Sequence, residues 1–173
     1  GKSMQGAGGA LVLGVVFNAY LTRTRFSRHQ QRKSPELWLR DGYYELQNVF
    51  VTFDGSMFIS VVMGLVDEQS GVMYYINAEH PYTAVYRNGR ASFIEGTIML
   101  RKIGTPDNSE RLQIQVFQLE PGDVIIAGSD GRDDLEIGRD ADGMRIINED
   151  ENEFLLRIEE SDSDLEKLVS ALE

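Results

Sequence analysis

The first third of the chain carries apolar residues at helical spacing. Residues 6–25 begin with GAGGAL and continue as a mostly apolar stretch, which predicts a helix whose small residues let another backbone approach closely. Residues 34–53 predict a second helix. Ser34 is a good N-cap, Pro35 suits the first helical position, and Glu36 complements the helix dipole. We expect the apolar face of this second helix to comprise Leu37, Tyr43, Leu46, Val49 and Phe50.

From residue 57 the pattern changes to β-branched and apolar runs separated by turn signals. Residues 57–67 and 72–79 predict a hairpin whose turn is EQSG. Residues 82–96 predict a second hairpin, because Asn88-Gly89 is the strongest short hairpin signal. The middle of the chain is therefore predicted to form antiparallel strands.

Two more strands are predicted before an acid-rich stretch. Residues 112–120 alternate polar and apolar positions, which is typical of a half-exposed strand. The turn PGD at residues 121–123 leads into residues 124–127, which are all apolar. We expect this last segment to be a buried strand.

The C-terminal part of the chain is rich in charge and gives a weaker pattern. Residues 151–160 fit either a helix or a strand, whereas residues 162–173 predict a helix capped by Asp162 or Ser163. Two helices, a run of antiparallel strands and a final helix indicate an α+β fold with helices packed on antiparallel sheet. We expect a single domain over residues 1–173.

Composition narrows the chemistry that is available. The chain has 173 residues, no cysteine and two histidines, His29 and His80. Disulfides and thiolate metal sites are excluded, and a metal would be held by oxygen ligands, which favours magnesium, manganese or calcium. The net charge of −11 argues against a nucleic-acid partner. Residues 23–33 are locally basic and fit either a solvated connector or a docking patch for an acidic partner.

The longest apolar stretch, residues 10–21, is shorter than the roughly 20 residues that cross a bilayer. No charged leader precedes it, so we expect neither a secretory signal nor membrane contact by this segment. The lack of cysteine fits a reducing compartment, and we expect a cytoplasmic location. The chain begins with Gly1-Lys2-Ser3 rather than methionine, as expected for a piece of a longer protein. The apolar first helix with its small residues offers a contact face for a homodimer.

Three short motifs are compatible with chemistry without requiring it. Gly1-Lys2-Ser3 matches the end of a phosphate-binding loop, but no parallel strand–helix pattern follows it. His80 follows a strand and precedes a proline, where it fits a structural hydrogen bond or a catalytic role, and no triad spacing accompanies it. Residues 138–149 fit a solvated acidic loop, and also match a calcium-binding loop at Asp140, Asp142, Gly143 and Glu149.

Asp130 is the candidate metal ligand that local sequence favours most. It follows the apolar run 124–127, precedes Gly131 and lies near Asp133 and Asp134. Like charges this close repel one another unless a cation or hydrogen-bond donors lie between them. Asp134 would reach the same region if the chain turns helically after Gly131. A metal site and a turn with an Asx bond and exposed acids both fit these residues.

Several segments, taken in order, resemble metal-dependent, type 2C (PPM-type) protein serine/threonine phosphatases. The similar branch is the bacterial one that includes stage II sporulation protein E and regulators that dephosphorylate anti-sigma-factor antagonists. Residues 1–11 resemble the family's glycine-histidine-glycine stretch at its first helix. Residues 57–89 resemble its central hairpin and asparagine-alanine-glycine-histidine signature, with Glu79 in place of the glycine. Residues 119–134 resemble its proline-glycine-aspartate turn and serine-aspartate-glycine motif.

This resemblance implies a sandwich of two antiparallel sheets with flanking helices (α-β-β-α), truncated here at both ends. It implies two manganese or magnesium ions and a metal-activated water that attacks the phosphate ester. Asp130 matches the family's metal-bridging aspartate, and Asp134 matches an acidic position linked to a weaker metal. The family's first metal aspartate would precede Gly1, and its last would follow Glu173.

The function implied by the resemblance is hydrolysis of phosphoserine or phosphothreonine on a bacterial regulatory protein, such as an anti-sigma-factor antagonist. The phosphatase would act as the cytoplasmic output domain of a larger sensor protein. An alternative is a catalytically inactive phosphatase-like module that binds a signalling partner. A third reading is an acidic α+β domain that is unrelated to phosphatases.

Overall fold

The structure, a computed structural model, describes residues 2–27, 32–98, 100–106, 112–132, 136–148, 150 and 152–172. The chain divides into two compact units. Unit 1 comprises Gly1–His80 and Thr97–Leu119, and unit 2 comprises Pro81–Gly96 and Glu120–Glu173. Each unit has its own sheet, helices and hydrophobic core. The single domain over residues 1–173 stays a prediction.

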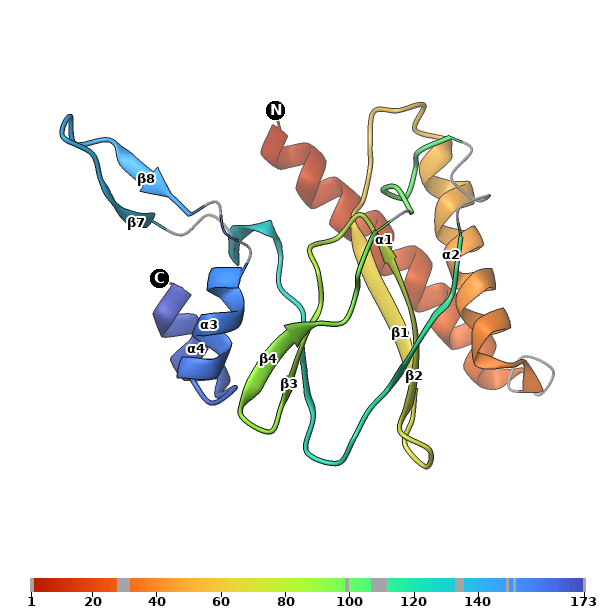
Figure 1. The fold of residues 1–173 in the computed structure, drawn as a ribbon. Helices are drawn as coiled ribbons and strands as arrows, with labels where there is room; N and C mark the ends of the chain where they lie inside the picture. The colour runs from red at the N-terminus through yellow and green to blue at the C-terminus, as the bar shows by residue number, and fades with distance from the viewer. Residues whose placement is uncertain are drawn as a thin grey trace. The chain divides into compact units, whose positions relative to one another are not determined.

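Unit 1 combines two helices with an antiparallel sheet (Figure 1). The sheet has the order β1-β2-β5, so that β2 is the central strand of its described part. In the β1–β2 hairpin, Gly64 lies opposite Tyr75. The elements of unit 1 are α1 (Lys2–Phe26), α2 (Pro35–Val51), β1 (Val61–Asp67), β2 (Val72–Ala78) and β5 (Gln115–Gln118).

Helix α2 begins where the sequence predicts, and Ser34 Oγ accepts a hydrogen bond from the backbone N–H of Leu37 at 3.4 Å. Its buried face differs at one position, because Leu37 is 39% exposed whereas Leu39 is fully buried. These two residues are separated by about 200° around the helix axis, so Leu37 points away from the core. The predicted face is confirmed at Tyr43, Leu46 and Phe50, with Val49 partly buried.

Helix α1 packs one apolar face on the core of unit 1. Tyr20 is buried on this face, and its hydroxyl donates to the carbonyl of Trp38 at 2.6 Å. The close approach expected from the small residues occurs at Gly9, where a Cβ atom would lie 2.7 Å from Cδ1 of Ile59. The neighbour at Gly9 is therefore a side chain from the segment before β1, not a second backbone.

The first predicted hairpin is confirmed, but its first strand begins at Val61 instead of residue 57. Ile59, in the segment before β1, pairs with Ile103 as an isolated antiparallel bridge. The two residues exchange backbone hydrogen bonds of 3.0 and 2.8 Å. The apolar residues before β1 are thus used to pack on α1 and on the 100–106 segment, and they do not extend the β1–β2 ladder.

Unit 2 contains a second antiparallel sheet, with the order β4-β3-β6 in its described residues. Strands β3 (Ala84–Arg87) and β4 (Arg90–Phe93) form the second predicted hairpin. Asn88 and Gly89 have φ angles of 51° and 81°, which a type I′ turn requires. Strand β6 (Val124–Ile126) pairs with the other side of β3.

Strand β6 is not the buried strand that its sequence predicts. It lies at an edge of its described sheet, and Val124 is 37% exposed. Strands β5 and β6 belong to different units, so the PGD segment connects two sheets and does not close a hairpin. An edge strand has one neighbour instead of two, which leaves its apolar side chains less covered than those of a central strand.

The C-terminal elements differ from the weak sequence pattern. Strands β7 (Glu136–Arg139) and β8 (Arg145–Ile147) form a hairpin that the sequence analysis missed, and the ambiguous segment forms helix α3 (Asn152–Glu160). Helix α4 (Leu165–Leu172) is capped by Asp164, whose Oδ1 accepts from the N–H of Lys167 at 3.0 Å. The predicted caps are wrong, because Asp162 and Ser163 adopt φ angles of 51° and 58° in the turn before the helix.

The predicted α+β class with helices and antiparallel sheets is confirmed. The core of unit 2 brings together Ala84 of β3, Phe154 and Ile158 of α3, and Leu168 of α4. None of the helices within the described residues combines the length and the hydropathy that a membrane span needs.

Candidate functional site

Asp130 lies just beyond the end of β6, at the start of a short 3₁₀ turn, Asp130–Arg132. The turn is closed by a hydrogen bond of 3.1 Å from the N–H of Arg132 to the carbonyl of Ser129. The side chain of Asp130 is exposed, and among the described residues its carboxylate has no hydrogen-bond or ion-pair partner. The alternative of an Asx-type bond is therefore not seen at Asp130, and its carboxylate is open to a ligand.

The chemistry of Asp130 fits magnesium or manganese, which prefer carboxylate oxygen ligands. Asp134, the other predicted metal ligand, and its neighbour Asp133 lie outside the described residues. Within the described part of the chain, no group of three or more potential metal-binding side chains comes together. Among the described residues of this turn, Asp130 thus offers a suitable carboxylate ligand, and the role of Asp134 stays a prediction.

The Asn77–His80 segment forms a turn at the end of β2. Asn77 is buried, and its Oδ1 accepts a hydrogen bond from the backbone N–H of His80 at 2.8 Å. Glu79 lies between them in the left-handed region, with φ of 48°. This conformation explains why a glycine suits the position and why glutamate is strained there. The hydrogen bond between His80 and Asn77 favours a structural role for this segment over a catalytic one.

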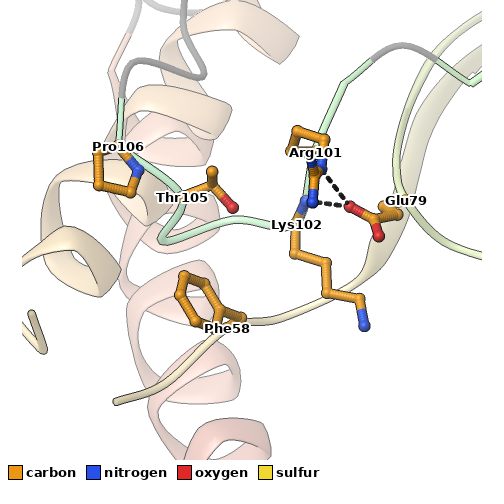
Figure 2. A pocket seen from close by; sticks show the side chains of 6 residues that line it. All are labelled: Phe58, Glu79, Arg101, Lys102, Thr105 and Pro106. Carbon is orange, nitrogen blue, oxygen red and sulfur yellow. Dashed lines mark hydrogen bonds and ion pairs between the residues drawn. The ribbon is translucent and has the colours of Figure 1, made fainter. Parts of the chain in front are cut away.

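Glu79 also lines a pocket of about 260 Å³ in unit 1. In Figure 2, Glu79 and the basic side chains of Arg101 and Lys102 line one side of the pocket, across from Phe58, Thr105 and Pro106. Arg101 Nε donates to Glu79 Oε2 at 2.9 Å, and the backbone N–H of Lys102 donates to the same oxygen at 3.3 Å. Burial raises the pKa of Glu79, but these hydrogen bonds outweigh it and hold the pKa below its ordinary value. The pocket therefore presents paired opposite charges.

Replacing Glu79 with glycine or alanine distinguishes the cost of its left-handed backbone from the stability that its ion pair contributes. Both Glu79→Gly and Glu79→Ala lose the exposed pair with Arg101, which contributes little. Only alanine retains the left-handed strain, so we expect the glycine variant to be more stable than the alanine variant by about 1 kcal/mol. Urea unfolding of the two variants measures this difference, and equal stabilities would show that the turn relaxes without glycine.

The PGD segment is a turn locked by its aspartate. Gly122 has φ of 95°, and the N–H of Asp123 donates to the carbonyl of Glu120 at 3.1 Å. The Asp123 carboxylate accepts from Nε and Nη2 of Arg87 at 2.8 and 2.6 Å and from the N–H of Glu120 at 2.8 Å. These bonds tie the start of β6, and hence the strand that leads to Asp130, to the end of β3.

The other sequence candidates do not assemble into sites in the described residues. Asp140 Oδ1 accepts from the N–H groups of Asp142 and Met144, so it closes the β7–β8 turn instead of a helix–loop–helix calcium loop. Glu149 and His29 lie outside the described residues. Lys2 begins α1, and every described pair of named strands is antiparallel, so the arrangement expected around a phosphate-binding loop is not observed.

Arg132 is a residue that the sequence analysis missed. It is 6% exposed, and its guanidinium lies 4.3 Å from the ring centroid of Phe154 and 5.6 Å from that of Phe93. An arginine next to a glycine in an acid-rich stretch is ordinarily a surface residue, so no local signal identifies it. Its burial depends on residues that are distant in the chain.

Comparisons with known proteins agree with this architecture. A family model described as stage II sporulation protein E (SpoIIE) matches residues 1–173. The photosystem II phosphatase PBCP is similar in structure, with 16% sequence identity, a TM-score of 0.52, and coverage of 92% of this chain and 56% of that chain. This likeness shows the fold. No curated protein gives a significant match.

A second solved structure is the phosphatase domain of the cell fate determinant SpoIIE from Bacillus subtilis (Mn presoaked). It has 12% sequence identity and a TM-score of 0.44, with coverage of 82% of this chain and 57% of that chain. The chain thus spans a little over half of the length of these two solved proteins.

Proposed function

The chain belongs to the stage II sporulation protein E family, and on this premise we propose that it forms part of a metal-dependent protein serine/threonine phosphatase. The observation that carries the proposal is the Asp130 carboxylate. It is exposed at the end of β6 and lacks a hydrogen-bond or ion-pair partner among the described residues. A carboxylate in this state is available to bind a divalent cation.

Asp130 would hold the metal ions, with Asp134 as a further acidic ligand. When bound, the metal ions supply a nucleophilic water at neutral pH and neutralise charge on the phosphate ester. The role of this chain's residues is to place oxygen ligands. Strand β6 and the 3₁₀ turn set the position of Asp130, and the Arg87–Asp123 pair holds the start of β6 against β3.

The proposed substrate is a phosphoserine or phosphothreonine on a regulatory protein, such as an anti-sigma-factor antagonist. PBCP, the solved protein of similar fold, is a photosystem II phosphatase, which supports the reaction class for the family fold. Either manganese or magnesium is part of the proposal, because both ions bind carboxylate oxygen ligands.

Metal removal tests the proposal. We expect the full protein to hydrolyse p-nitrophenyl phosphate and a phosphoserine peptide, to lose this activity in EDTA, and to regain it when Mn²⁺ or Mg²⁺ is added in excess. The physical reason is that the bound cation is the group that activates water in the proposed reaction, so its removal takes away the nucleophile. Phosphate release is the readout.

A matched titration with Ca²⁺ serves as the control, because calcium binds oxygen ligands but is larger and adopts looser geometry. Hydrolysis that survives EDTA would contradict the proposal. Specific binding of a phosphoprotein with no hydrolysis in any of the metals would favour the alternative function, a catalytically inactive module that binds a signalling partner.

A further inference from the structure

Arg132 is a buried cation in the turn that carries Asp130. Arginine side chains are seldom buried unless their charge is compensated, because removing a charge from water costs free energy. Arg132 is nevertheless only 6% exposed. The contacts of the buried Arg132 side chain therefore indicate its role.

The contacts of Arg132 join the turn to three separate segments of unit 2. Its Nη1 donates to the carbonyl of Tyr82, which precedes β3, at 2.5 Å. Its guanidinium lies over the rings of Phe93, at the end of β4, and Phe154, in α3. The Tyr82 and Phe93 rings are themselves in contact, with centroids 5.4 Å apart. A planar guanidinium suits such stacking, which a lysine ammonium does not reproduce.

Gly128 leaves room for the stem of Arg132. A Cβ atom at Gly128 would lie 3.3 Å from Cδ of Arg132, which is tighter than an ordinary contact. The small residue before the serine-aspartate-glycine motif thus lets the arginine fold back under its own turn. The turn itself is short, and a three-residue 3₁₀ turn with few internal bonds is poorly held without outside support.

We propose that Arg132 is a positioning residue for Asp130. Its guanidinium, which donates to the Tyr82 carbonyl and lies over the rings of Phe93 and Phe154, orients the turn that presents the Asp130 carboxylate to a divalent cation. This inference rests on the metal-binding role proposed above for Asp130. A metal ligand performs well only when supporting residues fix its orientation, and loss of such support typically lowers metal affinity about 10–100-fold.

The test measures Mn²⁺ affinity by isothermal titration calorimetry of the protein and its variants, with MnCl₂ as the probe. Arg132→Met keeps the stem and removes the guanidinium, and we expect it to weaken Mn²⁺ binding about 10-fold. Arg132→Lys keeps the charge but loses the planar stacking, so the Mn²⁺ affinity of this variant should lie between those of the wild type and Arg132→Met. Gly128→Ala, which crowds the stem, should weaken binding in the same direction.

Leu168→Ala is the matched control for stability. Leu168 is buried in α4 and belongs to the core cluster that contains Phe154, but it lies outside the 3₁₀ turn. We expect it to lower the melting temperature without changing Mn²⁺ affinity. Hydrogen exchange of the amides of residues 129–132 adds a metal-free readout, and we expect faster exchange in Arg132→Met than in Leu168→Ala.

Asp130→Asn separates failure of this inference from failure of the proposed function. If Asp130→Asn loses Mn²⁺ binding while Arg132→Met binds like the wild type, Arg132 is not a positioning residue and the metal role of Asp130 stands. If Leu168→Ala loses as much affinity as Arg132→Met, the role of Arg132 is general stability and the inference is overturned. If Asp130→Asn binds Mn²⁺ normally, the metal role of Asp130 fails and the inference fails with it.

Discussion

Asp130→Asn is expected to lower Mn²⁺ affinity by at least about 100-fold. Loss of a residue that only supports a metal ligand lowers affinity about 10–100-fold, and loss of the ligand itself should cost more. Metal-dependent hydrolysis of p-nitrophenyl phosphate should fall at least in parallel. Asparagine has nearly the same shape as aspartate but carries no charge, so the change removes the anionic ligand and keeps the turn. The side chain is exposed, and we therefore expect the melting temperature to stay close to that of the wild type.

Asp142→Asn is the matched control for this prediction. Asp142 is also an exposed aspartate of unit 2, in the β7–β8 turn, and its replacement makes the same change in net charge. We expect unchanged Mn²⁺ affinity and activity in this variant. Full metal-dependent activity in Asp130→Asn would show that Asp130 takes no part in the mechanism. An equal loss of Mn²⁺ affinity and activity in Asp130→Asn and Asp142→Asn would show that the effect comes from the change in net charge.

Asp123→Ala is expected to destabilise the protein by about 2–3 kcal/mol, because a buried carboxylate loses charge-assisted hydrogen bonds to Arg87 and to the Glu120 N–H. The side chain of Asp123 is 3% exposed, so water does not replace these partners in the folded wild type. The melting temperature should fall by roughly 5–10 °C for a domain of this size. Urea unfolding and thermal melting of wild type and variant measure the two quantities.

The difference between wild type and Asp123→Ala should depend on pH with a definite sign. The side-chain hydrogen bonds from Arg87 hold the pKa of Asp123 below its ordinary value, against the opposing effect of burial. A carboxyl with a depressed folded-state pKa stabilises the fold above its unfolded-state pKa of about 4 and loses this contribution as pH falls further. We therefore expect the two stability curves to converge below pH 4.

Glu120→Gln is the control for the Asp123 measurement. Glu120 also pairs with Arg87, at 2.7 Å, but its side chain is 54% exposed, so its loss should change stability little. An Asp123→Ala protein as stable as the wild type at neutral pH would contradict the role of Asp123 in locking the turn. A difference that persists unchanged at acid pH would show that the charge of Asp123 is not the source of its effect.

Features that depend on a few neighbouring residues could be read from the sequence. The Ser34 cap works within one helical turn, and the Asn88-Gly89 turn needs only two residues that accept positive φ. Asp130 was identified for a similar reason, because its place after an apolar run and before a glycine is a local property. The family resemblance rests on such short motifs taken in order.

Features that depend on distant partners could not be predicted in this way. Strands β5 and β6 follow one another in sequence, yet pairing with β2 and with β3 puts them in different sheets. Leu37 and Leu39 have the same chemistry, and only the position of the core decides which one is buried. Arg132 contacts the carbonyl of Tyr82, 50 residues away, and a ring in α3. Local sequence does not decide between these alternatives, and for Arg132 it favours the exposed one. Long-range packing decides, because burial free energy is gained only once the folded chain brings the partners together.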